Sequence, residues 1–96
     1  MKATVNYHDD LLHRLKDPQY AVGYLNAVLE EGEDGDFLLA IRDVAQVHGG
    51  LRQLAIKAGL NREHLFRMLS KSGNPELRSL RQVVEALGFR LVLQRA

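Results

Sequence analysis

The chain of 96 residues contains no cysteine, only two prolines and few aromatic residues. Without cysteine it can form no disulfide, no thiolate zinc site and no thiol nucleophile. No run approaches the roughly 18 apolar residues of a membrane-spanning helix, and the first residues hold no apolar stretch that could serve as a signal peptide. These absences lead us to expect a cytoplasmic protein without a membrane partner.

Length and composition fit one small domain. Hydrophobic residues make up 46% of the chain and charged residues 26%, which is ordinary for a globular protein. A domain of this size buries a small core, so we expect dimerisation or a bound partner to add stability. We expect residues 17–96 to form the domain and residues 1–16 to form an N-terminal arm.

Charge is divided unequally along the chain. The net charge is +1, but residues 1–49 carry four Lys or Arg against nine Asp or Glu, whereas residues 50–96 carry nine against three. The first half therefore has a net charge of −5 and the second half +6. A basic half favours a polyanion such as nucleic acid, and an acidic half favours a basic partner or self-complementation.

Apolar residues recur at helical spacing in five segments after residue 16. Asp17-Pro18 is a typical helix start, with aspartate as the N-cap and proline in the first helical position. Glycines after several of these segments favour helix ends, and residues 32–36 are expected to form an acidic turn. The predicted helices cover residues 18–31, 36–48, 51–58, 62–71 and 76–87. The last of them is expected to bury Leu77, Leu80, Val84 and Leu87.

The segment before residue 17 has little periodicity. Leu11, Leu12 and Leu15 can line one face of a short helix capped by Asp9 or Asp10. An unstructured arm fits the same pattern equally well.

The last residues favour a β-strand. From Phe89 to Gln94, apolar and polar side chains alternate in part, and strand-forming residues dominate. A single strand in a helical chain leaves its backbone unpaired, so we expect this strand to pair with its copy in a second subunit. The expected dimer residues are Phe89, Leu91, Val92 and Leu93.

The stretch LRQLAIKAGLNREHLFRML, residues 51–69, carries the functional signal. It reads as two short helices joined by a tight turn, with Gly59 where a turn needs positive φ and Ala55 where two helices cross closely. Apolar residues fall where packing of the helix pair requires them, at Leu54, Ala58, Leu60, Leu65 and Met68. We interpret this constellation as a helix-turn-helix.

The constellation resembles the Cro/CI-type, lambda-repressor-like helix-turn-helix domains of phage repressors. The segments YLNAVLEEGEDGDFLLAIRDVAQVHGG and LRQLAIKAGLNREHLFRMLSKSGNPELRSLRQVVEALGFRL resemble, more closely, the addiction-module antidote family related to the HigA antitoxins. The resemblance covers roughly residues 20–93. It implies a mainly α fold and a homodimeric type II antitoxin. Such a protein neutralises a RelE/ParE-like toxin encoded beside it and represses its own operon.

The second helix of this pair is expected to enter the major groove of DNA. Because its N-terminal residues meet base edges, the face opposite its buried leucines is the recognition face. Arginine can bind guanine with two hydrogen bonds, and glutamate can accept from a cytosine amino group or restrain an arginine four residues on. Phenylalanine can touch a thymine methyl or pack between helices. The predicted base contacts are Arg62, Glu63, Phe66 and Arg67.

Phosphate contacts are expected around this helix, since they fix the register on the duplex. Asn61 can serve a phosphate or cap its own helix. The predicted phosphate contacts are Arg52, Asn61, Lys71, Ser72, Asn74 and Arg78.

The acidic half is the expected binding site for the toxin. A toxin that acts on nucleic acid is expected to be basic, and the net charge of −5 would steer its encounter with this half. Alternatively, the apolar residues here simply pack on the core. The predicted toxin contacts are Leu11, Leu12, Leu15, Tyr20 and Tyr24.

Enzyme chemistry finds little support in the sequence. The four histidines are scattered without metal-ligand spacing, and no serine has a recognisable base beside it. We therefore predict no catalytic residue, no metal and no cofactor. Two other functions stay open, a prophage-type repressor without a toxin partner and a toxin-sequestering protein that does not bind DNA. RNA binding is disfavoured because only Phe66 offers a stacking aromatic on the recognition face.

Overall fold

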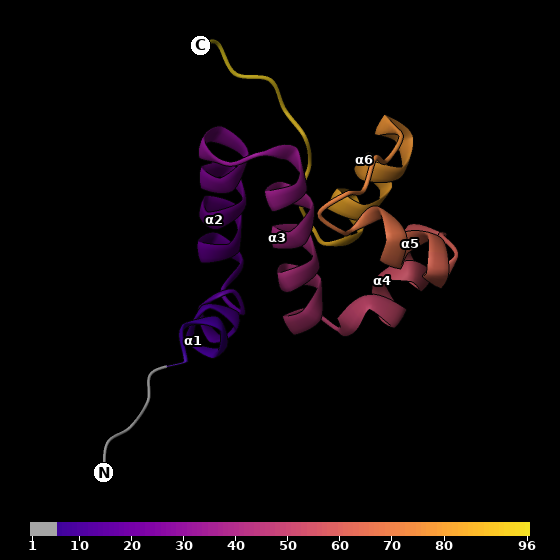
Figure 1. Ribbon diagram of the computed structural model, residues 1–96, viewed down its shortest axis with the longest axis horizontal. Helices are drawn as coiled ribbons and strands as arrows, with labels where there is room; N and C mark the ends of the chain where they lie inside the picture. The colour runs from indigo at the N-terminus through magenta and orange to yellow at the C-terminus, as the bar shows by residue number, and fades with distance from the viewer. Residues whose placement is uncertain (1–5) are drawn as a thin grey trace.

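The computed structural model describes residues 6–96, and in this part of the chain it forms six α-helices (Figure 1). None of these helices is both long enough and apolar enough to cross a membrane. The helices are α1 (Tyr7–Arg14), α2 (Pro18–Glu31), α3 (Asp34–Val47), α4 (Gly50–Ala58), α5 (Arg62–Met68) and α6 (Leu77–Ala86). The fold is therefore mainly helical, as predicted, and is compatible with a helix-turn-helix bundle.

Helix starts follow from capping side chains. The Asp17 carboxylate accepts a hydrogen bond from the N–H of Gln19 at 3.0 Å, which confirms the predicted start of α2. At α3 the N–H of Glu33 donates to the Asp36 carboxylate at 2.9 Å. With this cap the helix begins at Asp34, two residues earlier than predicted. The predicted acidic turn shrinks to the two residues between α2 and α3.

Helix α3 lies at the centre of the molecule, between α2 and the α4–α6 group (Figure 1). Its buried side chains form the middle of a single hydrophobic core, which also includes Ala21 and Leu25 of α2 and Val83 and Val84 of α6. The residues that α3 itself buries are Phe37, Leu38, Ala40, Ile41, Val44 and Ala45.

Helices α4 and α5 form the predicted pair. Gly59 adopts a φ of +70°, a conformation that favours glycine, and the N–H of Leu60 donates to the Ala55 carbonyl at 2.9 Å. The glycine conformation and this hydrogen bond end α4, and the chain then turns directly into α5. The predicted packing residues Leu54, Ala58, Leu65 and Met68 are all buried, and Leu60 packs against the core at its edge.

The N-terminal segment forms a helix packed on the core, not a free arm. Asn6, rather than Asp9 or Asp10, caps α1 by accepting from the N–H of Asp9 at 3.1 Å. After α1, Leu15 is completely buried, and its carbonyl accepts a hydrogen bond from Nε2–H of His48 at 2.7 Å. Residues 6–16 thus belong to the domain, while residues 1–5 of the predicted arm lie outside the described residues.

Two helical predictions need correction in the second half. Helix α5 ends at Met68 instead of residue 71, because the chain leaves the helix at Leu69 and the Ser70 hydroxyl donates to the Arg67 carbonyl at 2.7 Å. In α6, Leu77 is 66% exposed because it begins the helix beyond the core. Ser79 and Val83 are buried there in addition to the predicted Val84.

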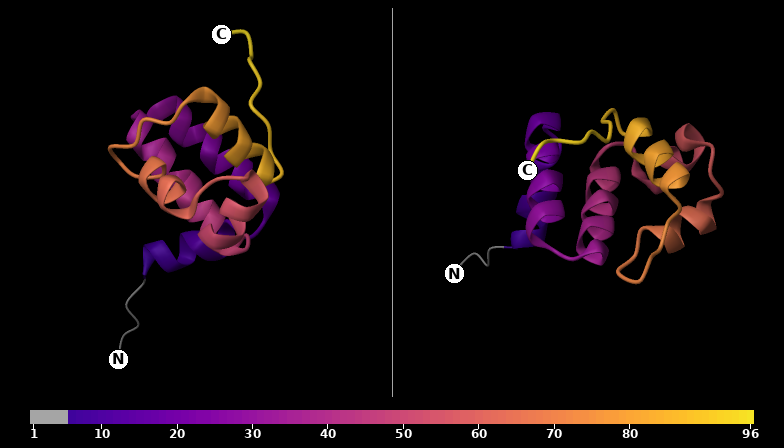
Figure 2. Two further views of the ribbon diagram at one scale, coloured as in Figure 1. Left: turned by 90° about the vertical axis from the view of Figure 1, so that its right-hand side faces the viewer. Right: turned by 90° about the horizontal axis from the view of Figure 1, so that it is seen from above.

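The predicted C-terminal strand is absent from the described residues. Phe89 is held by a hydrogen bond from its N–H to the Val84 carbonyl at 3.1 Å, but residues 90–96 run outward without secondary structure. Figure 2 shows this tail leaving α6, crossing toward α2 and projecting beyond the helices. A strand needs a neighbouring strand for its backbone hydrogen bonds, and the helices of one chain offer none.

The contact between Gly35 and the loop after α5 predicts opposite effects for two glycine substitutions. A Cβ at Gly35 would overlap the Lys71 carbonyl, whereas a Cβ at Gly23 on α2 has nothing within 4 Å. Gly35→Ala should destabilise the protein by about 1–3 kcal/mol through overpacking. Gly23→Ala, the matched control, should stabilise it by about 0.5–1 kcal/mol by favouring the helix. Urea unfolding measures both, and a shift of the two midpoints in the same direction would contradict the close contact at Gly35.

Candidate functional site

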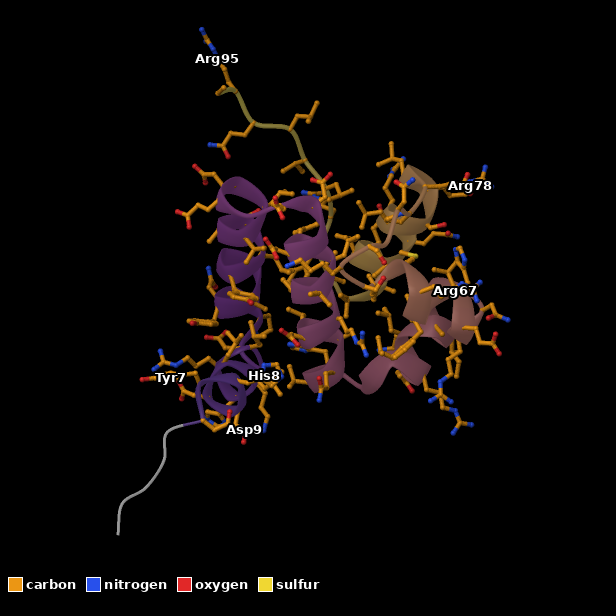
Figure 3. The ribbon with its side chains drawn as sticks, in the orientation of Figure 1. Tyr7, His8, Asp9, Arg67, Arg78 and Arg95 are labelled. Atoms are coloured by element: carbon orange, nitrogen blue, oxygen red, sulfur yellow. The ribbon has the colours of Figure 1, made fainter. Side chains whose placement is uncertain are left out.

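The four predicted base-contact residues lie together on the exposed face of α5. They line one open hollow of about 570 Å³, formed by Asn61, Arg62, Glu63, Phe66 and Arg67. Figure 3 shows Arg67 at the side of the molecule farthest from α1, directed outward. The structure therefore gathers the predicted residues on a single surface with two guanidinium groups, one carboxylate and one aromatic ring.

The surroundings of Asn61 and Glu63 distinguish between the two roles predicted for each residue. The Asn61 side-chain oxygen accepts from the N–H groups of Glu63 at 2.8 Å and His64 at 3.2 Å, so Asn61 caps its own helix. Only its amide NH₂ group is left to donate to a phosphate. Among the described ion pairs there is none between Glu63 and Arg67 within 4.0 Å. The Glu63 carboxylate is thus not held by that arginine.

Phe66 has a neighbour that the sequence analysis missed. The guanidinium carbon of Arg42, on α3, lies 4.3 Å from the centroid of the Phe66 ring, a cation–π contact. Phe66 is 49% exposed, so the ring both packs against Arg42 and contributes to the surface. Arg42 is a basic residue in the acidic half and follows the buried Ile41 on α3. Its position next to the buried residues of α3 is the signal in the sequence that could have indicated a contact between Arg42 and a neighbouring helix.

The predicted phosphate contacts are divided among different surfaces. Ser72 and Asn74 share a second open hollow, of about 610 Å³, with Arg67 and Phe66. The Lys71 ammonium lies 3.8 Å from the Asp36 carboxylate, and both groups are well exposed, so this ion pair is weak.

The other two predicted phosphate contacts lie in two further hollows. Arg52 borders one of about 420 Å³ that also reaches Arg42 and Arg62. Arg78 lies on α6 in another, of about 350 Å³, with Arg81 and Glu85, so it does not share a hollow with the residues of α5.

The predicted toxin-contact residues differ in accessibility. Leu15 is completely buried in the core, so its assignment as a surface anchor is wrong. Leu11, Leu12 and Tyr24 are half-buried and pack against the core, as the alternative interpretation expected. Tyr20 is 40% exposed and can make the contact that was predicted for it.

A polar cluster surrounds these residues where α1, α2 and α3 meet. The His8 Nε2 atom lies 3.9 Å from the Asp43 carboxylate. Burial raises the pKa of Asp43, against the opposing influence of His8 and Arg42, and burial followed by the Asp43 charge raises the pKa of Tyr24. On α1, Arg14 Nε donates to the Asp10 carboxylate at 2.9 Å, and this bond raises the pKa of Arg14. No group of three His, Asp or Glu among the described residues could hold a metal ion.

The predicted dimer residues lie in the tail after α6. Phe89 packs against the core, whereas Val92 and Leu93 are largely exposed, Leu93 completely at 102%. Leu91 is exposed to a smaller extent, at 39%. The three consecutive apolar side chains of Leu91, Val92 and Leu93 are therefore all exposed to solvent, and the exposed fraction rises along the tail.

Comparison with known proteins places the chain in a family. Residues 6–95 match the family described as "Probable addiction module antidote protein". The chain is also similar to an uncharacterized protein of Haemophilus influenzae, with 31% identity over 87 residues, which cover 91% of this chain and 89% of that protein. No solved structure matches it. The match extends over almost all of the described residues, and the chain therefore belongs to the probable addiction module antidote family.

Proposed function

We propose that this protein is an antitoxin that binds DNA through the exposed face of α5, represses its own operon and neutralises a RelE/ParE-like toxin. Membership of the antidote family supports the antitoxin role and implies a cognate toxin partner. The observation that carries the DNA-binding part is the joint hollow of Arg62, Glu63, Phe66 and Arg67.

The arrangement of this surface supports readout of DNA bases. α5 follows α4 through a tight turn, and its capped N-terminus presents Arg62 and Glu63 at the end that a recognition helix directs toward base edges. Arg62 and Arg67 have no carboxylate within 4.0 Å among the described residues, so their fork-shaped groups are free for guanine. Ser72 and Asn74 border the adjoining hollow and are available for the backbone.

We infer that the toxin binds the α1–α2 side, at Tyr20 and its acidic surroundings. Tyrosine is a frequent anchor of protein interfaces because it buries a large ring with little loss of side-chain entropy. Tyr20 is the most exposed of the predicted toxin contacts, and Asp10 and Asp17 lie on the same acidic half. A basic toxin would be steered toward this half by charge.

Substitution of the arginines on α5 tests DNA binding. Arg62→Ala and Arg67→Ala should each cost about 1–3 kcal/mol of specific binding to the DNA upstream of the gene and relax base preference at one position. Lys71→Ala should weaken specific and random DNA alike and lower the salt slope by about 1. Arg14→Ala on α1, which removes the same charge, is the control. Equal losses for all four variants on both DNAs would contradict the assignment of the recognition face.

Substitution of Tyr20 tests the toxin contact. Tyr20→Ala should weaken binding of the protein encoded beside this gene by about tenfold or more, because an interface tyrosine is replaced by a methyl group. DNA binding should be unchanged. Leu77→Ala, at an exposed apolar position on α6, is the control. Titration calorimetry and growth of cells that express the toxin measure the effect. If Tyr20→Ala neutralises the toxin fully and Leu77→Ala loses neutralisation, the toxin contact lies on the α6 side of the molecule instead.

The uncovered tail supports a homodimer in which Leu91, Val92 and Leu93 bury against a second copy. Burial of such side chains is worth about 1.5–3 kcal/mol each, enough to favour association of a small domain. Leu93→Asp should therefore shift the protein toward monomer in sedimentation experiments, since it would place a charge in the proposed contact between the two copies. Ile56→Asp on α4, at another exposed apolar position, should leave the dimer intact. The opposite pattern would place the dimer contact on α4.

A further inference from the structure

Arg42 holds a defined position beside the recognition face although it belongs to α3. Its guanidinium group stacks on the ring of Phe66, with 4.3 Å between the guanidinium carbon and the ring centroid, and the residue is half-buried. A stacked guanidinium keeps its N–H donors free at its edges, so the contact orients the group without consuming its hydrogen bonds. Arg42 is thus pre-organised to bind a ligand beside α5.

Three arginines border the hollow next to Arg42. Its volume is about 420 Å³, and its borders come from α3, α4 and the start of α5. Its lining residues are Arg42, Gln46, Gly50, Leu51, Arg52 and Arg62. No carboxylate is among them, and among the described ion pairs none of the three arginines has a partner within 4.0 Å.

Three guanidinium groups around one hollow repel one another unless an anion lies between them. The planar fork of arginine matches two oxygens of a phosphate or a carboxylate, and the proposed DNA surface beside the hollow favours phosphate. The hollow reaches Arg62 at the first position of α5, so a ligand bound there lies beside a helix that we propose reads bases.

We propose that Arg42 and Arg52 together hold one phosphate of the DNA backbone, next to the start of α5. This assignment rests on the proposed DNA binding and adds to it a contact from the acidic half of the chain. Arg42 contributes a donor group oriented by Phe66, Arg52 contributes one from the first turn of α4, and Arg62 stays available for a base. The backbone, rather than free phosphate, is the ligand because the hollow is open and adjoins the proposed base-reading surface.

Ethylation interference on the DNA upstream of the gene tests the contact directly. Arg42→Gln, which keeps the apolar stem, should weaken binding about tenfold or more and lower the salt slope by about 1. It should also lose interference at one phosphate, and Arg52→Gln should lose interference at the same phosphate. Arg42→Lys should keep the salt slope while binding less tightly, since it retains the charge but not the fork. Arg14→Gln, which removes an equal charge on α1, should match the wild type.

Thermal unfolding of each variant shows that it is folded before its DNA binding is interpreted, and Arg42→Lys serves if Arg42→Gln unfolds. Normal salt slope and unchanged interference in folded Arg42→Gln would overturn the proposal, as would loss of two different phosphates in the two glutamine variants. Saturable binding of inorganic phosphate, seen in the Arg42 side-chain NMR signal, together with unchanged interference in folded Arg42→Gln would assign the hollow to free phosphate and also overturn it. Failure of the wild type to bind the upstream DNA at all would instead refute the proposed function itself.

Discussion

Burial of α3 is the constraint on which the rest of the structure depends. This helix packs against α1 and α2 on one side and α4 on the other, so six of its fourteen residues are buried. Two adjacent polar residues between these buried positions contact helices on opposite sides of α3. Arg42 reaches Phe66 of α5, and the next residue, Asp43, lies 3.9 Å from His8 of α1. A single helix thus connects the proposed DNA surface with the proposed toxin surface.

The charge division of the sequence becomes a division in space. Helices α1 to α3 lie at one side of the molecule and α4 to α6 at the other, with Arg67 and Arg78 directed away from α1 (Figure 3). Besides apolar packing, two contacts of charged side chains join the halves among the described residues, the Lys71–Asp36 ion pair and the Arg42–Phe66 stack. The first is exposed and weak, whereas the second is half-buried and more favourable. The orientation of α5 relative to α3 therefore depends more on apolar packing and this stack than on surface charge.

Local signals in the sequence predicted local structure well. Asp17 and Gly59 lie where the structure uses them, as the cap of α2 and the turn between α4 and α5, because each acts on residues within one helical turn. Features that depend on distant partners were missed. Leu77 has helical spacing but no core beside it, the tail has strand-forming residues but no neighbouring strand, and Arg42 gained its role from a helix more than twenty residues away. Periodicity alone does not report which partner an exposed face meets.

The proposed toxin and DNA surfaces differ in how they are built. Around Tyr20 polar groups already contact one another, since Arg14 is bound to Asp10 and His8 lies 3.9 Å from Asp43, so a partner there must displace or extend existing contacts. Around α5 the arginines have no carboxylate partner among the described ion pairs, so a polyanion would complete their interactions instead of replacing them. Because the two surfaces lie on opposite sides of α3, a protein bound at Tyr20 need not cover Arg62 or Arg67. On the proposed assignment, repression and neutralisation can therefore occur on the same molecule at the same time.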